Sequence, residues 1–155
     1  IDGKQLQVSG HGVAVGSEVL EQDASYWEVR VKEVQESSVV GCGVCRPPPQ
    51  DGTIAEEFAT GNGTWGFKSS TAGLILKPDD VIGVTFSQSD MPMLKFYLNG
   101  ETIHGTEVDR VRGEVCPAVY VSGGATVQVS FAESKFLQKP PSPRYSQILV
   151  RYSML

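Results

Sequence analysis

The sequence predicts an all-β fold, an antiparallel β-sandwich in a single domain with a short C-terminal extension. Three observations lead to this prediction. Apolar and polar residues alternate with a period of two in several stretches, no helical stripe exceeds two turns, and Gly, Pro and Asn turn signals separate the stretches. Many short strands joined by regular turns are typical of such sandwiches.

The expected strands follow one another along the chain. YWEVRVKEV alternates so that Trp27, Val29 and Val31 share the buried face and its charged residues share the other. The stretches SVVGCGVC and DVIGVTF are apolar on both faces, so we expect them inside their sheets. Asn99-Gly100 predicts a tight hairpin, because both residues tolerate positive φ. The expected strands lie within residues 26–34, 38–45, from 65 onward, 80–86, 93–98, 101–105, 118–121 and 125–131.

The stretch TGNGTWG places Gly61, Gly63 and Gly66 in the G-x-G-x-x-G spacing of a phosphate-binding loop. Such a loop functions between a strand and a helix N-terminus. The residues before it do not read as a buried strand, and Ser69, Ser70 and Thr71 after it favour a turn. We therefore interpret these glycines as a bend that leads into a strand at Trp65.

Composition narrows the possible partners and compartment. The formal net charge of −5 disfavours a nucleic-acid partner, and no apolar run is long enough to cross a membrane. Three cysteines in 155 residues fit a reducing compartment better than a secreted, disulfide-framed domain. We therefore expect a cytoplasmic protein, and a monomer.

Charge is distributed unevenly along the chain. Residues 1–134 hold nine Lys and Arg against eighteen Asp and Glu, a balance of −9, whereas residues 135–155 hold four basic residues and no acid. The Pro-rich connector QKPPSPR lies in this basic part. We expect a domain at residues 1–137 and an extension at 138–155, which either packs on its own acidic domain or meets a partner.

No catalytic or metal-binding set is expected. Cys42 and Cys45 have C-x-x-C spacing, but residues three apart on a strand face opposite sides. His11 and His104 lie in glycine-bearing turns and have no nucleophile motif beside them. The sequence therefore predicts buried structural cysteines, surface histidines, no cofactor and no enzyme.

Two stretches are open to both a structural and a binding interpretation. Arg46, Pro47 and Pro48 either end a strand or form one wall of a pocket built from the loop that follows. Tyr120 faces away from Val119 and Val121, and is either a contact residue for a partner or a core residue with a satisfied hydroxyl.

The ordered set of strand motifs resembles the SPRY (B30.2-like) domain family. The motifs are SYWEVRV, VVGCGVC, GTWGFKS, DDVIGVTF, LKFYLNGETI and VCPAVYVSGGATVQVSF, spread over about residues 5–135. The resemblance implies a concanavalin-like β-sandwich that binds proteins or short peptides through loops at one end. Those loops would lie around residues 12–22, 46–63, 87–93 and 122–124.

The resemblance also implies individual contact residues. In peptide-binding relatives with a SOCS box, a Trp-Gly pair before the last core strand contacts the ligand. The matching positions here are Ser122 and Gly123, next to Gly124, so the aromatic anchor is absent. The Arg-Pro stretch of those relatives corresponds to residues 12–16, which supply Val13 and Ala14 instead.

The sequence thus favours a non-enzymatic module that recognises a peptide or protein partner. The alternative is a lectin-like carbohydrate-binding domain, in which Asn62 would hydrogen-bond a sugar and Trp65 would stack on it. The absence of an acidic cluster for Ca²⁺ weighs against that alternative.

Overall fold

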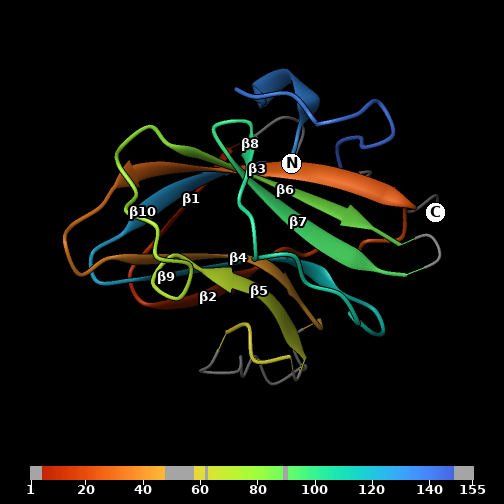
Figure 1. Ribbon diagram of the computed structural model, residues 1–155, viewed down its shortest axis with the longest axis horizontal. Helices are drawn as coiled ribbons and strands as arrows, with labels where there is room; N and C mark the ends of the chain where they lie inside the picture. Colours follow the sequence, from red (N-terminus) through yellow and green to blue (C-terminus); the bar gives the residue numbers. More distant parts are fainter. Residues whose placement is uncertain (1–4, 48–57, 62, 89–90, 149–155) are drawn as a thin grey trace, which may run out of the picture.

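A computed structural model describes residues 5–47, 58–61, 63–88 and 91–148 of the chain. Two antiparallel sheets stack face to face (Figure 1). The six-stranded sheet has the order β1-β10-β3-β6-β7-β8, and the four-stranded sheet has the order β2-β9-β4-β5. The strands are β1 Gln5–Ser9, β2 Gly12–Val15, β3 Ala24–Glu33, β4 Val39–Cys45, β5 Thr64–Lys68, β6 Val81–Ser87, β7 Met93–Leu98, β8 Glu101–Thr102, β9 Cys116–Ser122 and β10 Thr126–Ser130.

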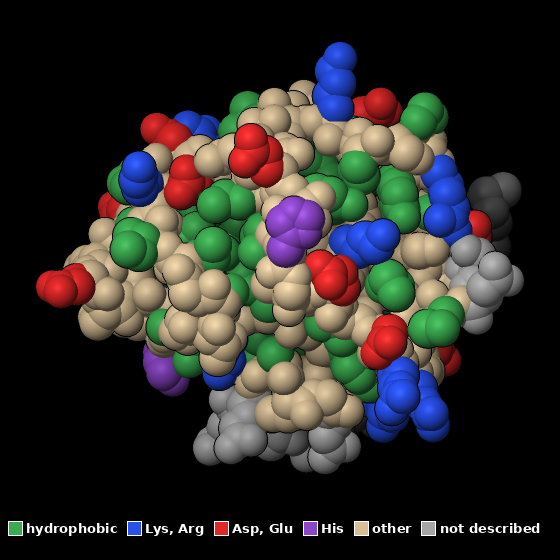
Figure 2. Space-filling model, viewed as in Figure 1, with side chains coloured by type: hydrophobic (Ala, Val, Ile, Leu, Met, Phe, Trp, Pro, Cys, Tyr) green, Lys and Arg blue, Asp and Glu red, His purple; other side chains and the backbone are tan. Residues whose placement is uncertain are grey.

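Helical structure is minimal in the described part of the chain. A single 3-10 turn, Glu133–Lys135, follows β10, and no described helix has the length and apolarity to cross a bilayer. In the edge-on view of Figure 2, hydrophobic side chains show along the seam between the sheets, and charged side chains of both signs are interspersed over the face. The all-β sandwich predicted from the alternation is confirmed.

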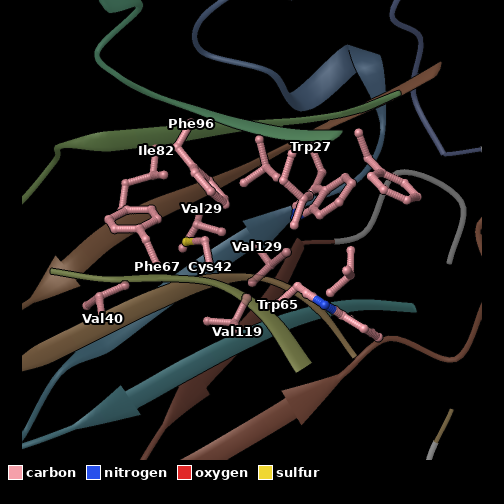
Figure 3. Close-up of a cluster of buried hydrophobic side chains, with 14 of the residues drawn as sticks. Trp27, Val29, Val40, Cys42, Trp65, Phe67, Ile82, Phe96, Val119 and Val129 are labelled. Carbon is pink, nitrogen blue, oxygen red and sulfur yellow. The ribbon is translucent and has the colours of Figure 1, made fainter. Parts of the chain in front are cut away.

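The core lies between the two sheets. Trp27, Val29, Ile82 and Phe96 project from the six-stranded sheet toward Val40, Cys42, Trp65, Phe67 and Val119 of the four-stranded sheet (Figure 3). Each of these side chains is buried, and Trp27 is completely so. The predicted central strands are confirmed, since β4 lies between β9 and β5 and β6 lies between β3 and β7.

Close backbone approach in the four-stranded sheet depends on two glycines. Gly43 on β4 is paired directly with Gly66 on β5. A Cβ atom at Gly43 would lie 1.9 Å from the carbonyl oxygen of Trp65 and 2.7 Å from the Cα of Gly66. Since real Cβ atoms do not approach other atoms so closely, the strands fit together only without a side chain here.

The turns were mostly predicted correctly. Asn99 and Gly100, with φ of 52° and 88°, form the tight β7–β8 hairpin. Gly61 and Gly63 precede β5 with positive φ, and a strand rather than a helix follows them. The bend interpretation of this glycine motif is confirmed.

The predicted loop at residues 12–22 is partly wrong. Residues 12–15 form β2, which pairs with β9 so that Val13 lies opposite Tyr120. β1 was also not predicted. Both strands are short and neither has a fully buried residue, so they lack the strong alternation that marks the central strands.

The prediction for the charged face of β3 also needs a correction. Glu28 was predicted to lie on a solvent-facing side, but it is 2% exposed. The segment after β10 crosses this face of the six-stranded sheet, and Leu137 and Gln138 donate their backbone N–H groups to the Glu28 carboxylate at 2.7 and 2.9 Å. The Tyr26 hydroxyl donates a third hydrogen bond at 2.7 Å.

The chain remains against the domain beyond this point. The backbone N–H of Tyr26 donates to the carbonyl of Ser146 at 2.8 Å, and Ile148 reaches the hydrophobic core. The described part of the basic extension, up to residue 148, therefore packs on the acidic domain. The division between residues 137 and 138 remains a prediction.

Candidate functional site

The outer face of the four-stranded sheet carries a second cluster of hydrophobic residues. Val40, Cys42 and Val44 of β4 point into the core, so Gly41, Gly43 and Cys45 lie on the other side. Cys45, Phe58 and Ala118 are buried in this outer cluster, with Val13, Val15 and Tyr120 packed around them. Strands therefore support this surface, rather than loops alone.

Register across the sheet places one row of residues side by side. Val13 on β2 is paired with Tyr120 on β9, Tyr120 with Gly41 on β4, and Gly41 with Lys68 on β5. Because Gly41 has no side chain, Phe58 lies directly over it. A Cβ at Gly41 would come within 3.0 Å of the Phe58 ring.

Tyr120 is the centre of this row. Its ring stacks on Phe58, with centroids 6.0 Å apart and planes 15° apart, and meets His11 edge-on at 6.1 Å. The Lys68 ammonium lies 4.6 Å from the ring centroid, within range of a cation–π interaction. We call His11, Val13, Phe58, Lys68 and Tyr120 the Tyr120 patch.

The polar side chains of the Tyr120 patch have no hydrogen-bond or ion-pair partner within the described part of the chain. No residue described there hydrogen-bonds to the Tyr120 hydroxyl, and none forms an ion pair with Lys68. The ring of Tyr120 is half-buried and His11 is exposed. The patch thus offers an apolar floor with hydrogen-bond donors at its rim. The role of Tyr120 as a contact residue for a partner stays a prediction.

The other predicted contact residues that the structure describes do not join the patch. β4 and β9 are antiparallel, with Val39 opposite Ser122 and Cys45 opposite Cys116. Arg46 and Pro47, which follow Cys45, are therefore about 20 Å from Ser122 along strands that rise about 3.3 Å per residue. The expectation that the contact loops share one end of the sandwich is wrong for these two groups.

Ser122 and Gly123 stabilise the turn between β9 and β10. Ser122 is buried, and a Cβ at Gly123 would lie 2.3 Å from the carbonyl oxygen of Ser37. Gly123 and Gly124 both have positive φ, 66° and 86°. The Ser38 hydroxyl donates to the Gly123 carbonyl at 2.8 Å. These contacts give the turn a structural role, and its binding role stays a prediction.

Residues on β2 and after β4 complete the predicted set. Ala14 is half-buried on β2 beside Val13. The Arg46 guanidinium lies 5.8 Å from the centroid of the Trp65 ring, and both Arg46 and Pro47 are exposed. Pro48, Asn62 and parts of the predicted loops at 46–63 and 87–93 lie outside the described residues. Trp65 is 6% exposed in the core, so it presents no stacking face for a sugar.

Sequence reasoning found Tyr120 and Val13 but missed three members of the patch. On β5, the apolar residues Trp65 and Phe67 share one face. The alternation therefore could have placed Lys68, the residue after Phe67, on the outer face. His11 was assigned to the surface without a partner. Phe58 gave no signal, because it comes from a long polar loop without periodicity.

The cysteines are buried, and the C-x-x-C pair is split between the two faces as predicted. Cys42 lies in the core, whereas Cys45 lies in the outer cluster opposite Cys116. Burial raises the pKa of the Cys45 thiol from 9.0 to about 11, with a further contribution from Cys116. Burial also raises the pKa of Cys42 and Cys116. These thiols stay protonated near neutral pH and are poor nucleophiles. No group of potential metal ligands occurs among the described residues.

These shifts predict a loss of stability in alkali. A thiol whose pKa is higher in the folded state than in the unfolded chain favours folding most below the unfolded pKa. That contribution is lost as pH rises from about 9 through about 11. We expect urea midpoints to fall between about pH 7.5 and about pH 10.5, and to fall less in Cys45→Ala. A urea midpoint that does not change over this pH range would contradict the raised pKa of the buried Cys45 thiol.

Comparison with known proteins identifies the family. The sequence pattern of the SPRY domain matches residues 24–134. SPRY domain-containing protein 7 from Gallus gallus is 26% identical over 92% of this chain and 74% of its own length. The Homo sapiens protein of that name is 27% identical over the same shares. The crystal structure of the SPRY domain of human HERC1 superposes with a TM-score of 0.56 at 18% identity, covering 84% of this chain and 89% of that one. The chain belongs to the SPRY domain family.

Proposed function

We propose that the chain is a non-enzymatic interaction module that recognises a peptide or protein partner through the Tyr120 patch. The observation that carries the proposal is that no described residue hydrogen-bonds to the hydroxyl of the half-buried Tyr120 or forms an ion pair with Lys68. The Tyr120 hydroxyl and the Lys68 ammonium border an apolar surface that two central strands, β4 and β9, hold in place. Tyrosines in such settings dominate many protein interfaces, because they supply apolar area and a hydroxyl together.

Rigidity of the surface supports this assignment. Val13, Tyr120 and Lys68 each sit on a paired strand, so little conformational entropy is lost when they contact a partner. Membership of the SPRY family, a family of protein-interaction domains, agrees with a binding role. We propose further that the domain acts as a monomer in the cytoplasm. Its three free, buried cysteines agree with a reducing compartment.

Peptide display from a proteome-derived library tests the proposal. Peptides selected on the wild-type domain should bind Tyr120→Ala about 10- to 100-fold more weakly, as expected for a central interface tyrosine. Tyr120→Phe removes only the hydroxyl, and Lys68→Gln removes only the charge, so both should give smaller losses. Affinities are measured by calorimetry after folding of each variant is checked by circular dichroism.

Tyr97 provides the matched control. It is a half-buried tyrosine on β7 of the other sheet, so Tyr97→Ala should leave the affinity unchanged. Selected peptides that bind Tyr120→Ala as tightly as the wild type would place the binding surface elsewhere. If no peptide is enriched on the wild-type domain, the proposal that the domain recognises short peptides is contradicted.

A further inference from the structure

The strands of the four-stranded sheet contain no acidic residue, although the chain as a whole is acidic. β2, β4, β5 and β9 form the lower layer in Figure 1, and Lys68 at the end of β5 is the only charged residue within them. The full sequence carries eighteen acids against thirteen Lys and Arg. The strands that support the Tyr120 patch therefore present one positive charge and no negative charge to a partner.

The Lys68 ammonium is positioned by its contact with Tyr120. It lies 4.6 Å from the centroid of the Tyr120 ring, and Lys68 is half-buried on a paired edge strand. A cation–π contact uses the face of the ring and leaves N–H groups of the ammonium available to an acceptor. No described residue forms an ion pair with Lys68 or a hydrogen bond with the Tyr120 hydroxyl. Two neighbouring donors are thus available to an anionic group.

Acidic residues act on the opposite end of β9. Burial raises the pKa of the Cys116 thiol, and the charges of Glu18 and Glu114 raise it further. Cys116 lies four residues before Tyr120 on this strand, about 13 Å away at about 3.3 Å per residue. An anion on the outer face of the sheet would therefore be attracted at the Tyr120 end and repelled at the Cys116 end.

An apolar residue continues the row on the other side of Tyr120. Val13 on β2 is paired with Tyr120, and neighbouring strands lie about 4.8 Å apart. The Lys68 ammonium, close to the Tyr120 ring, is therefore about 5–10 Å from Val13. In an extended peptide, side chains on one face are two residues and about 6.6 Å apart. Two such side chains of one peptide can contact Val13 and Lys68 together.

We propose that the partner segment at the Tyr120 patch carries an acidic side chain, whose carboxylate binds between the Lys68 ammonium and the Tyr120 hydroxyl. An apolar side chain two positions away packs on Val13. This inference rests on the proposed function and adds the chemistry of the ligand to it. A carboxylate has two oxygens and accepts from both donors at once. A basic segment would place a second cation beside Lys68 and is excluded by repulsion.

Parallel selections from one library of short random peptides test the acid preference. On the wild-type domain, we expect peptides with Asp or Glu two positions from an apolar residue. On Lys68→Glu, the preference should reverse, so that Lys or Arg takes the place of the acid. Lys95→Glu is the matched control, because it makes the same change in net charge at an exposed residue of β7 on the other sheet. It should enrich the same acidic peptides as the wild type.

A double-mutant cycle then measures the proposed pair directly. One enriched peptide, and its version with the acid changed to the amide, are titrated by calorimetry into the wild type and into Lys68→Gln. The amide should weaken binding to the wild type about 3- to 10-fold, as expected for a partly exposed charge pair. It should have little effect on Lys68→Gln, where the pair is already broken. Added salt should weaken wild-type binding of the acidic peptide toward the Lys68→Gln value.

The outcomes separate this inference from the proposed function. If the enriched peptides require Tyr120 but show no acid preference, or keep that preference on Lys68→Glu, the inference is overturned and the Tyr120 patch remains the binding surface. If the enriched peptides bind Tyr120→Ala as tightly as the wild type, the proposed function is overturned together with the inference. Thermal denaturation confirms that each Lys68 variant is folded.

Discussion

Gly43→Ala is expected to leave the protein unfolded under native conditions. The added methyl group would lie 1.9 Å from the Trp65 carbonyl oxygen and 2.7 Å from the Gly66 Cα, and both are backbone atoms of the paired strand. Neither atom moves without separating β4 from β5, the strand that carries the core residues Trp65 and Phe67. Overpacking against side chains costs about 1–3 kcal/mol, and a backbone obstruction exceeds that range. A typical domain has only about 5–15 kcal/mol of stability to lose.

Circular dichroism and the yield of soluble protein measure the effect. Gly105→Ala is the control, because nothing lies within 4 Å of the added methyl group there, although φ is +82°. It should cost about 1–2 kcal/mol for the left-handed backbone and leave the fold intact. If Gly43→Ala folds and loses no more stability than Gly105→Ala, β4 and β5 do not pair as closely as the structure shows.

Glu28→Ala is expected to destabilise the protein by about 3 kcal/mol or more, because each donor left without an acceptor costs about 1–3 kcal/mol. The carboxylate accepts hydrogen bonds from Tyr26, Leu137 and Gln138. Without it, the buried Tyr26 hydroxyl and two part-buried backbone N–H groups lose their acceptor. Urea denaturation measures the loss. Faster hydrogen exchange at Leu137 and Gln138 would show that this end of the segment has come free.

Glu33→Ala is the matched control for this effect. Glu33 ends the same strand, but it is exposed, so its removal should change stability by less than about 0.5 kcal/mol. Glu28→Gln keeps the volume and one acceptor oxygen, and should lie between the two variants. Equal stabilities for Glu28→Ala and Glu33→Ala would mean that the C-terminal segment is held by other contacts.

The contrast between Glu28 and Tyr120 shows where sequence reasoning succeeded and failed. Alternation placed Tyr120 opposite Val119 and Val121, and the structure agrees. The same alternation placed Glu28 correctly on the outer face of β3 but predicted solvent there. The residues that cover Glu28 lie about one hundred positions later in the chain, and no local pattern reports on them.

The predicted grouping of the contact loops at one end of the sandwich was wrong for a similar reason. Arg46 and Ser122 were grouped by family resemblance, yet the antiparallel pairing of β4 with β9 separates them. Lys68 was not selected, although register brings it into the row of Tyr120. Register follows from pairing between distant strands, and a shift of one residue would have moved Lys68 to the core side.

By itself, the sequence determined the fold class, the central strands, the Asn99-Gly100 hairpin and the burial of its cysteines. These features follow from side-chain alternation and turn chemistry, which act over a few residues. Only the tertiary structure decided that Phe58 lies on Gly41 beside Tyr120, that Glu28 anchors the segment after β10, and that Ser146 of the same segment pairs with the backbone of Tyr26. Those arrangements depend on contacts between residues far apart in the chain, whose geometry is set when the two sheets pack together.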